Sequence, residues 1–129
     1  MVSIMREVIA TKDAPQALGP YSQAIKANGF IFISGQLAID PSTQQVISGD
    51  AAAQTDRVLR NVSAILEAAG SSLDKVVRAC VFLKSMDDFA AMNEAYGKYF
   101  LSIRPARTTV EVARLPKGVL VEIEVIALA

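Results

Sequence analysis

Hydrophobic periodicity along this chain alternates between the two-residue repeat of strands and the spacing of amphipathic helices, and only two segments have the helical spacing. Residues 51–69 predict the first helix, with Asp50 as its N-cap and Gly70 just beyond its end. Ser85 is placed to cap the second helix. The segments that predict strands are 30–39, 75–83, 107–113 and 119–127, with two shorter candidates at 7–10 and 24–27.

Two helices can cover only one face of a sheet with this many strands. The order strand, helix, strand, helix, strand, strand, after the two short strands, therefore predicts an α+β sandwich with both helices on one face of a mixed sheet. The chain has 129 residues and no linker or low-complexity segment, so we expect a single domain over 1–129. The second face of the sheet must be solvated or covered by another chain.

The composition excludes several kinds of chemistry. The sequence has no histidine and one cysteine, Cys80, which excludes Ser-His-Asp and Cys-His catalysis and an intrachain disulfide. Thirteen Lys and Arg balance thirteen Asp and Glu, so the basic excess typical of nucleic-acid-binding proteins is absent. No apolar run reaches the ~18–20 residues of a membrane span. We expect a cytoplasmic protein, with an organelle entered through a removed presequence as the alternative.

The last two strand segments are predicted to pair as a hairpin around a turn at 115–118. Alternation then assigns one set of side chains to the face under the helices: Thr108, Val110, Val112, Val121, Ile123 and Val125. The opposite set would lie on the open face: Arg107, Thr109, Glu111, Leu120, Glu122, Glu124 and Ile126. In this register Arg107 and Glu122 are about 13 Å apart. They would therefore meet through a neighbouring chain, or through water and substrate.

The charged open face has two interpretations. It is either a solvated face with cross-strand charge pairs, or a site for a small carboxylate at a subunit interface. The neighbouring strands favour the interface, because they are apolar on both faces and Phe30, Phe32, Val76 and Phe82 cannot all lie under two helices. We therefore expect a closed homo-oligomer that packs through the open face.

Three segments resemble the RidA/YjgF family of reactive-intermediate deaminases: GPYSQAIKANGFIFISGQ at 19–36, PARTTVEVARLP at 105–116 and VEIEVIAL at 121–128. The resemblance implies a chorismate-mutase-like fold with a six-stranded sheet, and a homotrimer whose sheets line a central barrel with clefts between the chains. The implied reaction hydrolyses 2-aminoacrylate/2-iminopropanoate and 2-iminobutanoate to 2-oxo acids and ammonia, which protects pyridoxal-phosphate enzymes. No metal or organic cofactor is implied.

The resemblance also implies roles for charged residues. Arg107 matches the arginine that binds the substrate carboxylate, and a planar guanidinium suits two parallel charge-assisted hydrogen bonds. Glu122 matches the acidic residue that orients or activates water, and a carboxyl group suits proton transfer to the imine nitrogen. Glu124 is the rival for that role, and its charge would raise the pKa of one of the two carboxyl groups.

Five further residues match the substrate-binding positions of the family. Tyr21 matches the aromatic residue that closes over the substrate, and Asn93, with Tyr96 nearby, matches the second helix beside the cleft. Ser34 and Gly35 match the Ser-Gly where the backbone approaches the ligand, although Gly35 could equally form a β-bulge. Thr109 stands where many members have cysteine, and we expect activity to persist because imine hydrolysis needs no covalent step. Cys80 is expected to be a small core side chain.

Three other functions remain as alternatives. In the first, the protein is a sensing module whose cleft binds a 2-oxo acid without catalysis. RNA cleavage with inhibition of translation is attributed to some family members, and zero net charge argues against it here. A chaperone-like role through exposed apolar surface is the third.

Overall fold

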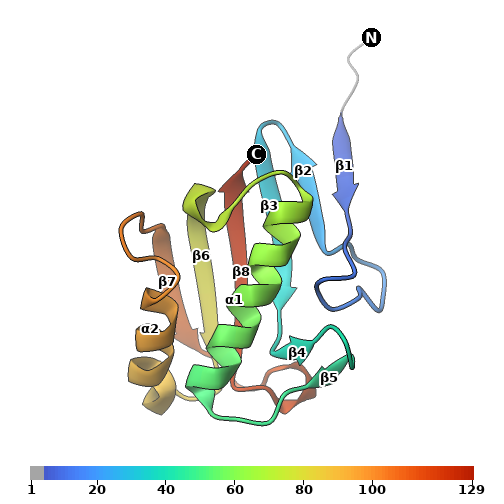
Figure 1. Ribbon diagram of the computed structural model, residues 1–129. Coiled ribbons are helices and arrows are strands. Elements are labelled where there is room, and N and C mark those ends of the chain that lie inside the picture. The colour runs from blue at the N-terminus through green and yellow to red at the C-terminus, as the bar shows by residue number, and fades with distance from the viewer. Residues whose placement is uncertain (1–4) are drawn as a thin grey trace.

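The computed structural model describes residues 5–129 and consists of a six-stranded sheet with two helices on one face (Figure 1). The strand order is β1-β2-β3-β8-β6-β7. The strands are β1 (Arg6–Ile9), β2 (Ala24–Ala27), β3 (Phe30–Gln36), β6 (Val76–Leu83), β7 (Ala106–Glu111) and β8 (Val121–Leu128). The helices are α1 (Ala51–Ala68) and α2 (Phe89–Gly97). This architecture confirms the predicted α+β class with two helices on a mixed sheet.

Short elements connect the main ones. Strands β4 (Ile39–Asp40) and β5 (Gln45–Val46) form a separate hairpin that was not among the predicted strands. Single 3₁₀ turns lie at η1 (Leu73–Lys75), η2 (Met86–Asp88) and η3 (Pro116–Gly118). Among residues 5–129, no helix is long and apolar enough to cross a bilayer.

Helix α1 begins and ends close to where its sequence predicts. The side chain of Asp50 accepts a hydrogen bond of 2.9 Å from the backbone N–H of Ala53, as an N-cap does. Gly70 has φ of 80°, which is favourable for glycine and stops the helix. The apolar stripe of α1 is fully buried against β3 and β8, and it includes Val58, Leu59, Val62, Ile65 and Leu66.

The pairing of β7 differs from the prediction. β7 runs parallel to β6 at the edge of the sheet, with Arg107 opposite Ala79 and Thr109 opposite Val81, whereas β8 pairs with the other side of β6. The expected hairpin between 107–113 and 119–127 is therefore wrong. Helix α2 connects β6 to β7, and a connection of this length allows a parallel crossover.

This register changes the faces assigned to β7. Residues that lie opposite each other point to the same side of a sheet, and Ala79 and Val81 are completely buried under the helices. Arg107, Thr109 and Glu111 therefore lie on the helix side, and Thr108 and Val110 point to the open face, the reverse of the prediction. The assignment for β8 is confirmed, since its alternate valines and isoleucine are buried: Val121, Ile123 and Val125.

The face opposite the helices, the open face, is largely apolar. Phe30 and Phe32 are 39% and 46% exposed there. Val76 does not join them, because an irregularity between Val76 and Arg78 turns Val76 into the core and leaves Val77 exposed. Cys80 lies opposite Glu124 and is only partly buried, so its predicted place in the core is also wrong.

Candidate functional site

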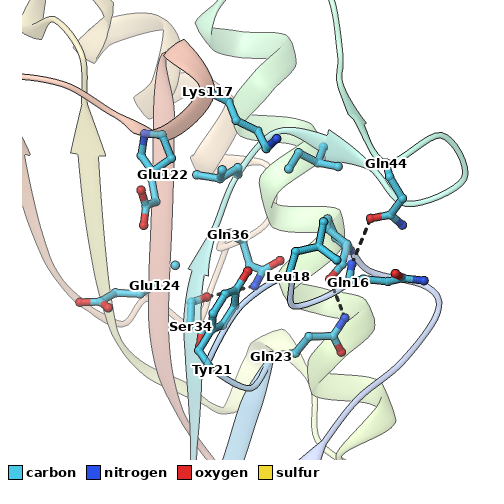
Figure 2. A pocket seen from close by; sticks show the side chains of 15 residues that line it. Gln16, Leu18, Tyr21, Gln23, Ser34, Gln36, Gln44, Lys117, Glu122 and Glu124 are labelled. Carbon is cyan, nitrogen blue, oxygen red and sulfur yellow. Dashed lines mark hydrogen bonds between the residues drawn. The ribbon is translucent and has the colours of Figure 1, made fainter.

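A cavity of about 640 Å³ opens between the N-terminal segment, the end of β3 and β8 (Figure 2). We call this cavity the carboxylate pocket. Five of the residues singled out from the sequence line it: Tyr21, Ser34, Gly35, Glu122 and Glu124. Amide side chains and one ammonium group also line it, from Gln16, Gln23, Gln36, Gln44 and Lys117.

Glu122 occupies the space that a side chain at Gly35 would need. A Cβ atom at Gly35 would overlap a carboxylate oxygen of Glu122 and lie 2.9 Å from its Cδ atom. The β3–β8 register shifts between Ile33 and Gln36, so Gly35 also lies in a bulge. Burial raises the pKa of the Glu122 carboxyl group above its ordinary value, and the charge of Glu124 raises it further. This carboxyl group therefore retains its proton to higher pH than a solvated glutamate.

The end of β3 holds the segment that carries Tyr21. The Ser34 hydroxyl donates a 2.6 Å hydrogen bond to the carbonyl of Ser22. The Gln23 side chain is almost fully buried; it donates to the carbonyls of Pro15 and Thr11 and accepts from the N–H of Thr11. Tyr21 itself is 54% exposed beside the cavity (Figure 2). Its ring is therefore accessible to a ligand.

Helix α1 supports the far wall of the carboxylate pocket through Asn61, which is not among the residues singled out from the sequence. Asn61 is fully buried, and its Nδ2 donates to the carbonyls of Leu37 and Ile39 at 3.2 and 2.9 Å. Its Oδ1 accepts a hydrogen bond of 3.0 Å from Arg57. Leu37 and Ile39 both line the cavity. A polar residue inside the apolar stripe of a helix, directly before Val62, was the available signal.

Gln54 makes a similar connection to the loop before β8. It is almost fully buried in α1, and its Oε1 accepts a 2.8 Å hydrogen bond from the backbone N–H of Leu120. Lys117, in this loop, has φ of 57°, a left-handed backbone that is uncommon outside glycine, and it lines the carboxylate pocket. Neither residue is among those singled out from the sequence.

Arg107 belongs to a different cavity, of about 460 Å³, at the edge formed by β7 and α2. We call this cavity the arginine pocket, because Arg104 and Arg107 line it together with Asn93 and Tyr96. The Arg107 guanidinium lies 4.7 Å from the ring centroid of Tyr96 and 5.7 Å from that of Phe89. Within the described range, Arg107 makes no hydrogen bond or ion pair, so its N–H donors are available to a ligand.

Thr109 lies on the same side of β7 as Arg107 and is partly buried. Its hydroxyl oxygen has no hydrogen-bond partner among residues 5–129. The hydroxyl oxygen of Tyr96 is also buried and lacks a described partner, and burial raises the pKa of this phenol while the charge of Arg107 lowers it. The two orphan hydroxyl groups and the free guanidinium leave this side of the chain with unused hydrogen-bonding capacity.

One chain does not bring Arg107 and Glu122 together. They lie on opposite faces of the sheet, and β6 separates their strands, which places them two strand spacings or about 10 Å apart across the sheet. Phe82 lies opposite both Glu122 and Val110, so Arg107 is also displaced by three residues along the strand, about another 10 Å. The three- and four-carbon imino acids that the family resemblance implies are too short to span this separation.

No cluster of three His, Cys, Asp or Glu side chains that could hold a metal ion occurs in the part of the chain that the structure describes. The two pockets differ in their polar groups. The guanidinium groups of Arg104 and Arg107 suit a small organic anion, whereas the carboxylate pocket offers carboxyl, hydroxyl and amide groups.

Residues 11–129 match the family model described as Endoribonuclease L-PSP. The chain belongs to this family, also called YjgF/RidA. The match covers nearly all of the chain, including both pockets.

Relatives within the YjgF/RidA family have names of two kinds. A RutC family protein from Pyrococcus horikoshii is 58% identical over 123 residues, covering 95% of this chain and 98% of the relative. The 2-iminobutanoate/2-iminopropanoate deaminase of Mus musculus is 46% identical over 127 residues, covering 98% of this chain and 94% of the relative. The crystal structure of RidA from an Antarctic Psychrobacter species is 46% identical, has a TM-score of 0.92 and covers 95% and 99% of the two chains. The fold expected from the sequence is therefore that of the Rid proteins.

Proposed function

We propose that this YjgF/RidA protein is a homotrimeric deaminase that hydrolyses 2-aminoacrylate/2-iminopropanoate and 2-iminobutanoate to 2-oxo acids and ammonia. Each site would combine the arginine pocket of one chain with the carboxylate pocket of its neighbour. The observation that carries the proposal is the placement of a free guanidinium and a partly buried carboxyl group on opposite faces of one chain. The name of the mouse relative supports the choice of reaction.

Charge and apolarity both favour such an assembly. The arginine pocket contains two guanidinium groups, from Arg104 and Arg107, and the carboxylate pocket contains Glu122 and Glu124. Opposite charges on two surfaces of one chain favour a head-to-tail contact between copies, and such contacts form a ring when the rotation between copies closes. The exposed phenylalanines of the open face, Phe30 and Phe32, lose contact with water in the same assembly.

Substrate binding would begin at Arg107. A guanidinium with free N–H donors binds a carboxylate through two parallel hydrogen bonds, which fixes both the position and the plane of a 2-imino acid. Asn93 lines the same pocket and offers a further hydrogen bond, and Thr109 offers its hydroxyl or backbone groups from the same strand. Tyr21, Ser34 and Gly35 of the neighbouring chain would enclose the rest of the substrate.

Glu122 would perform the proton transfers. In its protonated form it donates a proton to the imine nitrogen, and the resulting carboxylate accepts a proton from the water that attacks the imine carbon. Glu122, protonated again by this water, then donates the proton to the amino group of the tetrahedral intermediate. The carbon–nitrogen bond breaks to release ammonia, and the carboxylate accepts the hydroxyl proton as the carbonyl forms. The balance is one imino acid and one water to one 2-oxo acid and one ammonia. Water and a carboxyl group supply every proton, so the mechanism uses no cofactor.

The cytoplasmic location stays a prediction.

The sharpest test mixes two inactive variants. Arg107→Ala and Glu122→Gln trimers should each lose imine hydrolysis, measured as 2-oxo acid formation from an imine generated in the assay. After joint unfolding and refolding at equal amounts, about a quarter of the interfaces should pair an intact arginine with an intact carboxyl group and recover activity. The control is the same treatment of each variant alone. A mixture that stays inactive while wild-type protein recovers would place the site within one chain and overturn the proposal.

The alternatives give different results in the same experiments. Arg107→Lys should also be poor, because a point charge does not reproduce the planar fork. Wild-type protein that binds pyruvate but never accelerates imine hydrolysis would be a sensing module. RNA cleavage that resists Glu122→Gln, without imine hydrolysis, would favour the activity in the family's description.

A further inference from the structure

The side chain of Arg107 needs support that its own strand does not provide. β7 is an edge strand, so β6 is its only neighbour within the described sheet, and the residue opposite Arg107 is the small Ala79. An arginine side chain has many rotamers, and a guanidinium that moved among them would bind a carboxylate poorly. Something outside the sheet must restrict it.

Two rings of α2 face the guanidinium. Phe89 and Tyr96 are seven residues apart, two helical turns, and therefore lie on the same side of α2. Their ring centroids are 5.7 and 4.7 Å from the Arg107 Cζ atom. Tyr96 is 6% exposed and its ring packs 4.6 Å from that of Phe100, so the nearer ring is fixed within the core.

We infer that Tyr96 and Phe89 form an aromatic platform that positions the Arg107 guanidinium for a carboxylate. The inference rests on the proposed function, because it assigns Arg107 that ligand. An acidic partner would hold the arginine equally well, but it would neutralise the charge and occupy the N–H donors that the substrate needs. A ring attracts the cation through its π face and leaves the donors free.

The ring of Tyr96, and not its hydroxyl group, performs this role. The hydroxyl oxygen is buried without a partner among the described residues, so it contributes no hydrogen bond that orients Arg107. A phenylalanine at this position would retain the platform. A leucine would fill much of the same volume but present no π face.

Two substitutions at one position therefore separate the ring from the hydroxyl. We expect Tyr96→Phe to bind pyruvate within about twofold of wild type, whereas Tyr96→Leu should raise the Kd for pyruvate and the KM for the imine by about tenfold. The kcat of Tyr96→Leu should stay within about threefold, because Glu122 is untouched. Calorimetry gives the Kd, and a coupled oxidase assay gives KM and kcat.

The matched control is Tyr99→Leu, which removes a second tyrosine ring whose hydroxyl donates to Asp56 and which does not lie over Arg107. It should lower the melting temperature and leave the pyruvate Kd unchanged. Phe89→Leu tests the platform at a partly buried ring and should raise the Kd by about threefold, less than Tyr96→Leu because this ring is farther away. If Tyr96→Leu fails to fold, the pyruvate Kd of Phe89→Leu tests the aromatic platform on its own.

Two results would overturn the platform. One is a Tyr96→Phe protein as impaired as Tyr96→Leu, which would assign the effect to the hydroxyl group. The other is an unchanged pyruvate Kd in Phe89→Leu and in any folded Tyr96→Leu protein. Wild-type protein that binds pyruvate but hydrolyses no imine would remove the deaminase proposal alone, while normal hydrolysis with unaltered Tyr96→Leu kinetics would remove the platform alone.

Discussion

At Gly35 the backbone passes so close to the Glu122 carboxyl group that no side chain fits between them. The family resemblance links this glycine to the approach of a ligand. In the single chain, the space beside it belongs to Glu122 instead. The glycine therefore sets the position of the carboxyl group that we propose as the proton donor.

Gly35→Ala tests this relation. The added methyl group should displace the Glu122 carboxyl group and lower kcat by about a hundredfold, a typical cost of misplacing a catalytic group by ~1 Å. A double-mutant cycle provides the control, because Glu122→Asp shortens the side chain and makes room. Steady-state kinetics should find Gly35→Ala/Glu122→Asp no worse than Glu122→Asp alone. A double variant with the full loss of both single changes would contradict the explanation.

The pH dependence of activity should follow the pKa of Glu122. Burial raises this pKa above 4.5, and the charge of Glu124 raises it further, so the proton needed for the imine nitrogen is lost only as the pH rises through the raised value. Glu124→Gln removes the second cause. It should shift the fall of kcat/KM to lower pH, with the pKa followed by NMR titration of Glu122. A shift to higher pH, or none, would show that Glu124 does not act on Glu122.

The same pKa shift has a consequence for stability. Between 4.5 and its raised pKa, Glu122 binds more protons in the folded chain than in the unfolded chain. Its contribution to the free energy of unfolding therefore falls as the pH rises through this window. Glu124→Gln should lower the pKa of Glu122 in the folded chain, and therefore narrow the pH range over which Glu122 reduces stability.

At the scale of elements, sequence periodicity predicts which segments become strands and helices better than it predicts which strands pair. α1 has a clear apolar stripe and a capping aspartate, and β8 alternates valine or isoleucine with glutamate, so both were placed correctly. In β7 the alternation is clear, since Arg107 and Glu111 point to one face and Val110 to the other, but every residue of this edge strand is partly buried or exposed, so the charged set can lie on the helix side. The alternation alone fits an antiparallel return or a parallel crossover equally well. The helix between β6 and β7 was the signal for the crossover.

The candidate site shows the same limit. Except for Thr109, the side chains that the family resemblance selected lie in two pockets, but their distribution over two faces depends on the register of β7. Contacts made between distant segments were invisible in the sequence, such as those of Asn61 with the residues before and within β4. The irregularity that turns Val76 into the core was equally hidden, because one extra residue reverses every side chain beyond it.

Asn61→Ala should show how much α1 contributes to the wall of the carboxylate pocket. The change removes hydrogen bonds to the carbonyls of Leu37 and Ile39 and leaves both without that donor, so we expect the free energy of unfolding to fall by about 2–3 kcal/mol. Urea denaturation measures the loss. Glu67→Ala, on the exposed side of the same helix, should change it by less than about 0.5 kcal/mol. Equal effects of the two changes would deny the buried amide a special role.

At the scale of the whole molecule, the open face should determine whether the chains assemble. Phe32 is 46% exposed, so Phe32→Glu should fold but place a charge in the proposed interface. We expect sedimentation to find monomers and the assay to find almost no imine hydrolysis. Ala68→Glu introduces the same charge on the exposed side of α1 and should leave the trimer and its activity intact. An active Phe32→Glu monomer would separate catalysis from assembly.

Because the proposed site takes Arg107 from one chain and Glu122 from its neighbour, its activity should depend on the protein concentration. A folded monomer would carry one arginine pocket and one carboxylate pocket, and each pocket would need a different neighbouring chain to complete a site. Dilution should therefore reduce the specific activity before any chain unfolds, because separation dismantles the catalytic centre while each fold survives it.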